Sequence, residues 1–379
     1  MAASFSSNIL LVWFLSPAAF GLFATLNAIV GLAGSVVNFR TPEVVLRTSE
    51  DELDSRFLAS IGSAICLEGI LIAGVVLVVL SAWNLNHVGA FILLGTTITT
   101  TWLRTEVRLY ERTFDYGTIS KMEVVPHVVA HATVVGGAAM GGGELMLYLR
   151  GAIRAGGIFL VLWYIGSIGS FPVRWIGRQE WKTLLSRISG IWGDGLLEQS
   201  FRRAAMLVVS SLAGESVTGL FYQARKLSMI PVRLVTSIVD RLGLNYFSRQ
   251  GEADRMRALR RALLVVASLL GLTAIAAWQL GPLVIPVVLG EEWTGVAPLL
   301  ALMSGIIIGF PLLSLVKVYY MAGEEMGRFI LLGRSIQYIA AFAVVGAALL
   351  MGVRPEYGLS VALSAGYLSG LVCSYLAIR

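Results

Sequence analysis

Residues 57–82 decide the fold, and they read FLASIGSAICLEGILIAGVVLVVLSA. As an α-helix this stretch would rise about 39 Å, against about 30 Å for the hydrocarbon core of a bilayer. Glu68 is its only charged residue. Because the apolar run is continuous rather than alternating, it indicates a membrane-spanning helix and not a strand of a membrane barrel.

The rest of the chain has the same character. Of its 379 residues, 56% are hydrophobic and 14% are charged, and the mean hydropathy is +0.78. A soluble domain carries about 25% charged residues, and hydrophobic cores stop growing beyond about 250–300 residues. The composition therefore excludes a soluble enzyme and a disordered or fibrous protein. It predicts an all-α polytopic membrane protein with short loops.

Twelve apolar runs mark the expected transmembrane helices. They are residues 5–15, 18–39, 57–82, 88–103, 124–140, 145–168, 184–211, 217–247, 258–280, 297–321, 328–351 and 357–378. The first run would rise only about 16 Å, which is too short to cross the bilayer. We therefore expect a truncated first helix, or a start that is assigned too late.

Basic residues indicate the orientation of the chain. They gather in the even-numbered loops: Arg40, Arg47 and Arg56 in the second, Arg104, Arg108, Arg112 and Lys121 in the fourth, Arg174, Arg178 and Lys182 in the sixth, Arg249, Arg255 and Arg257 in the eighth. Among the odd loops, only the eleventh has a basic residue, Arg354. Since basic loops stay in the cytoplasm, both termini are expected there. The net charge of +6 is thus explained without nucleic acid as a partner.

The sequence also indicates an internal duplication. Gly-Leu-Phe recurs in residues 15–23, LSPAAFGLF, and 212–221, LAGESVTGLF, 198 positions apart, in each case at the start of the following span. Ala-Trp-Asn-Leu at 82–85 and Ala-Trp-Gln-Leu at 277–280 are 195 positions apart. The prediction is two six-helix bundles, residues 1–183 and 184–379. Because each half has an even number of spans, the two would be parallel repeats, with the substrate bound between them.

Charged residues inside the predicted spans are the candidate functional residues, because burying them in lipid is costly. Arginine binds phosphate bidentately, so the arginines of the sixth to eighth spans predict a site for an anionic headgroup such as a diphosphate. They are Arg150, Arg154, Arg202, Arg203, Arg225 and Arg233. Asp194, Glu198 and Arg202 are spaced by four and form one polar stripe. The alternative is that such charges are internal ion pairs that only fix helix packing.

His127 and His131 have the i, i+4 spacing of a zinc pair. A catalytic zinc needs a third protein ligand, and no Glu follows His127 as in a zinc protease helix. A polar face towards the transport cavity is the favoured interpretation, and proton coupling is the alternative. The glycine-rich residues 136–143 lack the Lys-Ser/Thr of a phosphate-binding loop. No catalytic residue and no metal site are predicted.

Three stretches together resemble one family. LSPAAFGLF at 15–23 is similar to the family's Leu-Gly-Pro-Glu-Glu-Tyr-Gly-Leu-Phe turn. GLFYQARKL at 219–227 resembles its Gly-Leu-Tyr-x-x-Ala-x-Arg-Leu, with Pro231 at the family's mid-helix proline. LGEEW at 289–293, followed by APLL at 297–300, resembles its Leu-Gly-x-x-Trp-x-x-Ala-x-x-Leu-Leu. The family is that of the Wzx-type polysaccharide flippases, in the multidrug/oligosaccharidyl-lipid/polysaccharide (MOP) exporter superfamily, and the likeness covers nearly the whole chain.

The resemblance implies a function. Such a flippase moves an undecaprenyl-diphosphate-linked oligosaccharide across the bacterial inner membrane by alternating access, for O-antigen, exopolysaccharide or capsule assembly. It implies no cofactor, coupling to a proton or sodium gradient, and as partners the lipid-linked substrate, membrane lipids, a polysaccharide polymerase and other assembly proteins. One departure affects the coupling ion: Arg202-Arg203-Ala204-Ala205 stands where many relatives have an acidic residue. The remaining candidates for ion coupling are Asp194, Glu198, Asp240 and Glu68.

Two other functions stay open from the sequence. A cation-coupled drug or metabolite exporter shares the topology, but it would favour an apolar or acidic cavity over one rich in arginine. A membrane glycosyltransferase or polysaccharide polymerase should have a long extracytoplasmic loop. The longest predicted one here, residues 281–296, is short.

Overall fold

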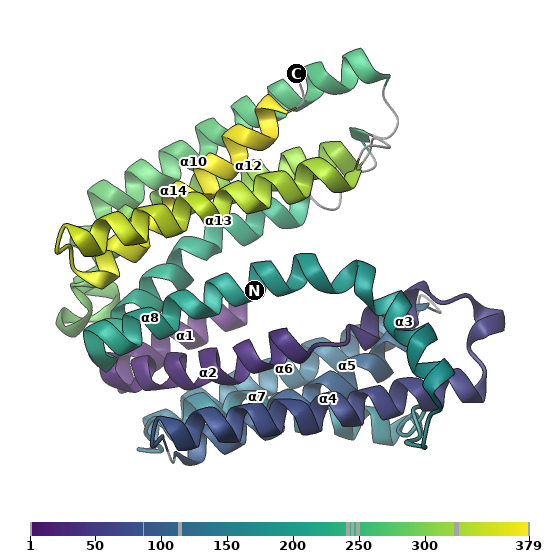
Figure 1. The fold of residues 1–379 in the computed structure, drawn as a ribbon. Coiled ribbons are helices and arrows are strands. Elements are labelled where there is room, and N and C mark those ends of the chain that lie inside the picture. Colours follow the sequence, from purple (N-terminus) through teal and green to yellow (C-terminus); the bar gives the residue numbers. More distant parts are fainter. Residues whose placement is uncertain are drawn as a thin grey trace. The chain divides into compact units, whose positions relative to one another are not determined.

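The computed structural model describes residues 2–377 except 86, 113–115, 240–242, 244–245, 248–250 and 322–325. Within these residues the secondary structure is helical throughout and contains no strand (Figure 1). The prediction of an all-α protein is confirmed.

The chain packs into two compact units. Unit 1 consists of residues 1–15 and 22–207, and unit 2 of residues 16–21 and 208–379. The chain passes between the units three times: between residues 15 and 16, and then inside α2 (Pro17–Val37) and inside α8 (Arg178–Ile238), two helices visible in Figure 1. The predicted division into two six-helix bundles, residues 1–183 and 184–379, stays a prediction.

Unit 1 is a bundle of long helices. With most of α2 and the first part of α8, it contains α1 (Ala2–Phe14), α3 (Thr41–Arg47), η1 (Glu50–Glu52), α4 (Ser55–Ala82), α5 (Val88–Arg112), α6 (Tyr116–Ala139) and α7 (Leu145–Tyr164). Asp54 caps α4 by accepting a hydrogen bond from the Phe57 N–H. α7 packs against α6 and α5, and α6 packs against α1. The contact of α6 with α7 is close, because a methyl group at Gly157 would lie 2.7 Å from Cβ of Pro126.

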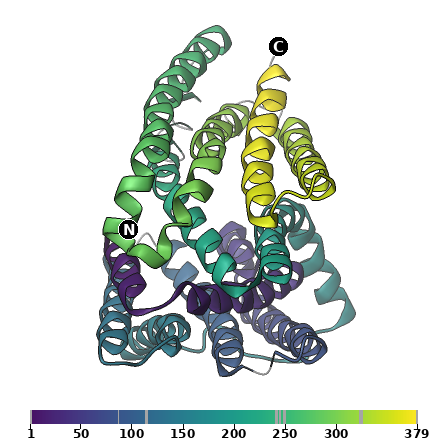
Figure 2. The ribbon, with the colours of Figure 1, turned by 90° about the vertical axis from the view of Figure 1, so that its left-hand side faces the viewer.

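Unit 2 has a similar helical build. With the second part of α8, it contains α10 (Glu252–Leu289), η3 (Glu291–Trp293), α11 (Val296–Leu302), α12 (Ser304–Met321), α13 (Met326–Leu350) and α14 (Pro355–Leu376). α13 and α14 lie side by side, as both views show (Figures 1 and 2). Gly366 and Gly370 of α14 let this pair approach closely, because a methyl group at either would lie within about 3 Å of the α13 backbone or side chains near Gln337.

The described helices include seven that are long and apolar enough to cross a membrane, and eight if the bent pair of η3–α11 and α12 counts as one span. This pair bends by 46°. The Ser364 hydroxyl of α14 donates a 2.6 Å hydrogen bond to the Leu302 carbonyl at the bend. This carbonyl oxygen therefore has a hydrogen-bond partner although the helix is interrupted there. The predicted seventh and eighth spans are merged in α8, with a non-helical break at Gly214, whose φ is 81°. The multi-pass membrane architecture is therefore confirmed, and the count of twelve spans stays a prediction.

The duplicated Gly-Leu-Phe motifs meet inside unit 2. A methyl group at Gly21 would lie 1.8 Å from the Glu215 carbonyl oxygen, and one at Gly219 would lie 1.8 Å from the Pro17 carbonyl oxygen. Both corresponding pairs, Gly21 with Gly219 and Pro17 with Glu215, are 198 positions apart. The start of α2 and the second part of α8 therefore cross with reciprocal contacts, backbone against backbone.

Candidate functional site

Two of the predicted headgroup-binding arginines lie one turn apart on α7 in unit 1. The Arg150 guanidinium is half-buried, and its central carbon lies 5.8 Å from the centroid of the Phe23 ring, in a cation–π contact. Arg154 is exposed. Since α7 is one of the membrane-spanning helices, an exposed guanidinium there requires water or an anion beside it rather than lipid tails.

The two histidines lie on α6, the neighbour of α7. Their rings meet edge to face, with centroids 4.4 Å apart. His131 is buried, and its Nδ1 shares a hydrogen bond with the Ser7 hydroxyl of α1, whereas His127 is half-buried. The charges of Arg150 and Arg154 act on His127. We call Arg150, Arg154, His127 and His131 the α6–α7 cationic patch.

The structure places the histidines on α6, which packs against the α7 helix of Arg150 and Arg154. Their predicted polar face towards the transport cavity stays a prediction. In the described part of the chain, no group of three His, Cys, Asp or Glu side chains could hold a metal ion. The guanidinium groups of the patch are charged hydrogen-bond donors, and each imidazole can donate from a ring N–H group.

Arg203 is engaged differently from the α7 arginines. Its Nη1 donates a 3.2 Å hydrogen bond to the Asn27 carbonyl of α2. The guanidinium occupies the space left by the missing side chain of Gly31, where a methyl group would lie 1.2 Å from Nη1. In this conformation Arg203 holds the first part of α8 against α2, which is the packing role that the sequence left open. Arg202 next to it is half-buried.

The remaining predicted arginines belong to unit 2. Arg225 is half-buried and Arg233 is exposed, both on the second part of α8. Next to Arg225, the Lys226 ammonium lies 5.5 Å from the centroid of the Tyr222 ring. The predicted set of arginines is thus divided between the units, with Arg150, Arg154, Arg202 and Arg203 in unit 1.

Among the candidates for ion coupling, only Glu68 has a described side chain. It is 2% exposed in α4 and accepts a 3.1 Å hydrogen bond from the Phe39 N–H, which follows α2. Asp194 and Glu198 lie on α8, but their side chains are outside the described residues, as is the whole of Asp240.

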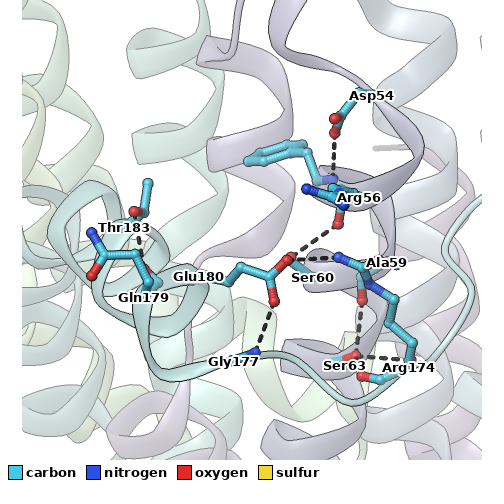
Figure 3. A network of polar contacts seen from close by, with 11 residues as sticks. Asp54, Arg56, Ala59, Ser60, Ser63, Arg174, Gly177, Gln179, Glu180 and Thr183 are labelled. Atoms are coloured by element: carbon cyan, nitrogen blue, oxygen red, sulfur yellow. Dashed lines mark hydrogen bonds and ion pairs between the residues drawn. The ribbon is translucent and has the colours of Figure 1, made fainter.

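A polar network that the sequence did not predict fixes residues 165–177, which we call the α7–α8 segment. Glu106 of α5 accepts hydrogen bonds from the Gly169 and Ser170 N–H groups, each 3.1 Å long. At the other end of the segment, the Glu180 carboxylate accepts from the Gly177 N–H and pairs with Arg174 (Figure 3). The sequence carries no distinctive signal for Glu106, because the same predicted loop also contains Glu111, Asp115 and Glu123.

Comparison with known proteins identifies the family. The sequence model of the family described as polysaccharide biosynthesis protein matches residues 10–298. The amylovoran biosynthesis protein AmsL of Erwinia amylovora is 24% identical over 198 residues, which are 49% of this chain and 48% of that protein. The match therefore spans about half the length of this curated relative.

Two solved structures have a similar fold. The lipid II flippase MurJ, in an inward closed conformation, has a TM-score of 0.66 and 14% identity, covering 100% of this chain and 86% of that one. An inward-facing multidrug resistance MATE transporter of the MOP superfamily has a TM-score of 0.68 and 14% identity, covering 98% and 93%. At such low identity these likenesses show the fold. The chain belongs to the polysaccharide biosynthesis protein family, and it has the fold of the MOP-superfamily flippases and transporters.

Proposed function

We propose that this protein is a flippase that moves an undecaprenyl-diphosphate-linked oligosaccharide across the bacterial inner membrane, for O-antigen, exopolysaccharide or capsule assembly. Family membership supports the role in polysaccharide biosynthesis, and the MOP fold supports transport rather than catalysis. The observation that carries the proposal is the α6–α7 cationic patch. Within the described part of the chain, neither Arg150 nor Arg154 has a carboxylate partner, although both lie on a membrane-spanning helix.

In this proposal the diphosphate binds to the arginines by charge-assisted hydrogen bonds, and the polyprenyl tail stays in the bilayer. Both termini face the cytoplasm, as the basic loops indicate. Alternating access between two six-helix bundles exposes the site first to one side and then to the other. A proton or sodium gradient drives the cycle without a cofactor, with Asp194, Glu198, Asp240 and Glu68 as candidates for the coupling site. A polysaccharide polymerase and other assembly proteins act on the product.

The test is transport in proteoliposomes loaded with a lipid-linked oligosaccharide, followed by its exposure to an impermeant lectin. Arg150→Gln with Arg154→Gln removes two charged donors, each worth about 1.5–3 kcal/mol. We expect at least a tenfold loss of transport, with partial recovery in the Arg150→Lys, Arg154→Lys protein, because a lysine keeps the charge without the bidentate geometry.

Arg260→Gln with Arg261→Gln, which removes two exposed arginines of α10, is the matched control and should transport normally. Wild-type transport by a folded Arg150→Gln, Arg154→Gln protein would refute the headgroup site. Gain of organic-cation export by that variant would instead support the drug or metabolite exporter.

A further inference from the structure

The α7–α8 segment is fixed to unit 1 along its length and is not a free tether. Phe171 and Ile176 are 4% and 5% exposed, and Phe171 packs in a cluster with Ile61 and Val45. A methyl group at Gly62 would lie 2.5 Å from the carbonyl oxygens of both Phe171 and Pro172, so the segment runs directly against α4.

Polar contacts add to this attachment. The Ser63 hydroxyl of α4 accepts a 3.1 Å hydrogen bond from the Arg174 N–H and donates one to the Arg174 carbonyl (Figure 3). The hydroxyl groups of Tyr110 and Ser167 are also hydrogen-bonded to each other. With Glu106 and Glu180, these contacts hold the backbone in one conformation, so the side chains that point outwards are presented at fixed positions.

Helix lengths place the segment at an edge of the hydrocarbon core. About 20 helical residues cross that core, and counting 20 back from Ala82, where α4 ends, reaches Ser63. Counting 20 forward from Val88, where α5 begins, reaches Val107, next to Glu106. α7 itself has 20 residues and ends at Tyr164, directly before the segment. Three helices therefore place their contacts with the segment at the same depth, the boundary between acyl chains and headgroups.

The outward side of the segment combines apolar and basic side chains. Trp175 is 96% exposed and Val173 is 66% exposed. Arg174, Arg178 and Lys182 are exposed beside them, and the nearby acid Glu180 is paired with Arg174. Four acidic residues, Glu50, Asp51, Glu52 and Asp54, lie before the start of α4. That start is eight residues, or about 12 Å along the helix, from Ser63. Among the charged side chains from Arg174 to Lys182, three are basic and Glu180 alone is acidic, so this stretch carries net positive charge.

We propose that the α7–α8 segment is an interfacial anchor that binds anionic phospholipids. Trp175 and Val173 insert between the headgroups, where tryptophan is enriched in membrane proteins. Arg178 and Lys182 contact the lipid phosphates, as basic clusters beside a membrane do. The depth of the segment favours lipid over a soluble protein as the occupant, and the basic residues favour an anionic lipid over a zwitterionic one. The proposal does not depend on which glycan is transported.

The test uses the full chain in nanodiscs that contain either dibrominated phosphatidylglycerol or dibrominated phosphatidylcholine at the same mole fraction. Bromine quenches tryptophan fluorescence on contact, and the contribution of Trp175 is the difference between the wild type and Trp175→Phe. We expect Trp175 to be quenched by both lipids, and about twofold more by the anionic one. Arg178→Gln with Lys182→Gln should bring the ratio to about one, since both charges are lost. Arg260→Gln with Arg261→Gln on α10 should leave it unchanged.

Three results would overturn the proposal. If neither brominated lipid quenches Trp175, the segment faces water when aqueous acrylamide quenches it and a protein surface when acrylamide does not. Equal quenching by the two lipids would remove the anionic selectivity. Recovery of Trp175 fluorescence on adding a few mole per cent of undecaprenyl diphosphate would make the segment a substrate site instead. Each readout is independent of transport, so failure here leaves the proposed flippase function standing.

Discussion

At the scale of single residues, Arg203 shows how an intramembrane charge acquires a structural role. The sequence predicts a cation in the seventh span, and burial costs alone suggest a ligand for it. The structure provides a backbone carbonyl at Asn27 and an open space at Gly31. These features belong to a helix about 175 residues earlier in the chain. Spacing within one helix predicts which residues share a face. It does not predict which glycine on another helix leaves space for one of their side chains.

The contact between the Arg203 guanidinium and Gly31 gives a prediction about stability. Gly31→Ala should displace the Arg203 guanidinium and lower the free energy of unfolding by about 1–3 kcal/mol, as overpacking does. In an Arg203→Ala background the same change should cost much less, because the methyl group then meets no guanidinium. Denaturation in mixed micelles measures both costs. Gly74→Ala on α4, with nothing within 4 Å of the new methyl group, is the control. Equal costs in the two backgrounds would contradict the contact.

Ser7 gives a second prediction at this scale. Ser7→Ala removes the hydroxyl that is hydrogen-bonded to the buried His131 ring. We expect the free energy of unfolding to fall by about 1–3 kcal/mol, because the buried imidazole loses one hydrogen-bond partner. Ser6→Ala, one position earlier on α1 and exposed, should change the midpoint of thermal unfolding little. Matching midpoints for the two variants would argue against a structural role for the Ser7–His131 bond.

At the scale of elements, the sequence predicted the duplicated motifs but not their mutual contact. The two copies of Gly-Leu-Phe predict two repeats, and in the structure Gly21 and Gly219 are each other's neighbours. The merging of two predicted spans in α8 was also not predicted. Between the two apolar runs there is no loop, and the helix is interrupted only by the non-helical φ and ψ of Gly214. A hydropathy pattern marks helices and their ends, but it does not report which backbones touch.

The reciprocal crossing predicts matched effects. Gly21→Ala and Gly219→Ala should each destabilise the protein by about 3 kcal/mol, the upper part of the range for overpacking, because each new methyl group meets backbone that cannot rotate away. The two losses should agree within about 1 kcal/mol, since the contacts are equivalent. Urea or dodecyl sulfate titration of detergent-solubilised protein would measure them. Gly136→Ala, with nothing within 4 Å, serves as the control, and a silent Gly219→Ala would disprove the crossing.

Glu106 gives a prediction for the α7–α8 segment. Glu106→Ala leaves the Gly169 and Ser170 N–H groups without their acceptor, and a hydrogen bond to a charged group contributes about 1.5–3 kcal/mol. Amide hydrogen exchange in residues 165–177 should therefore accelerate at least tenfold. Glu123→Ala on α6, where the carboxylate is exposed, should leave that exchange unchanged. Unaltered exchange in Glu106→Ala would show that the other contacts of the segment hold it without the Glu106 carboxylate.

At the scale of the whole molecule, composition and hydropathy were sufficient for the fold class. An all-α multi-pass protein followed from the long apolar runs, because no soluble architecture buries so much apolar surface. The bounds of the packing units have no signal in the sequence, since residues 16–21 pack with unit 2 and residues 22–207 with unit 1. Which unit a helical segment packs with depends on close contacts such as that of Arg203 with Gly31 and the backbone crossing at Gly219. For the site, the sequence selected the arginines by type, and the structure then separated the exposed Arg154 from the packed Arg203.

The bend between α11 and α12 has a consequence for biogenesis. The Leu302 carbonyl at this bend accepts its hydrogen bond from Ser364, which the ribosome adds 62 residues later. At about 5–20 residues per second, roughly 3–12 s pass between the two. During that interval the bent span enters the membrane with its partner hydroxyl still unmade. A nascent chain arrested before α14 would therefore lack the hydroxyl that satisfies the Leu302 carbonyl at the bend.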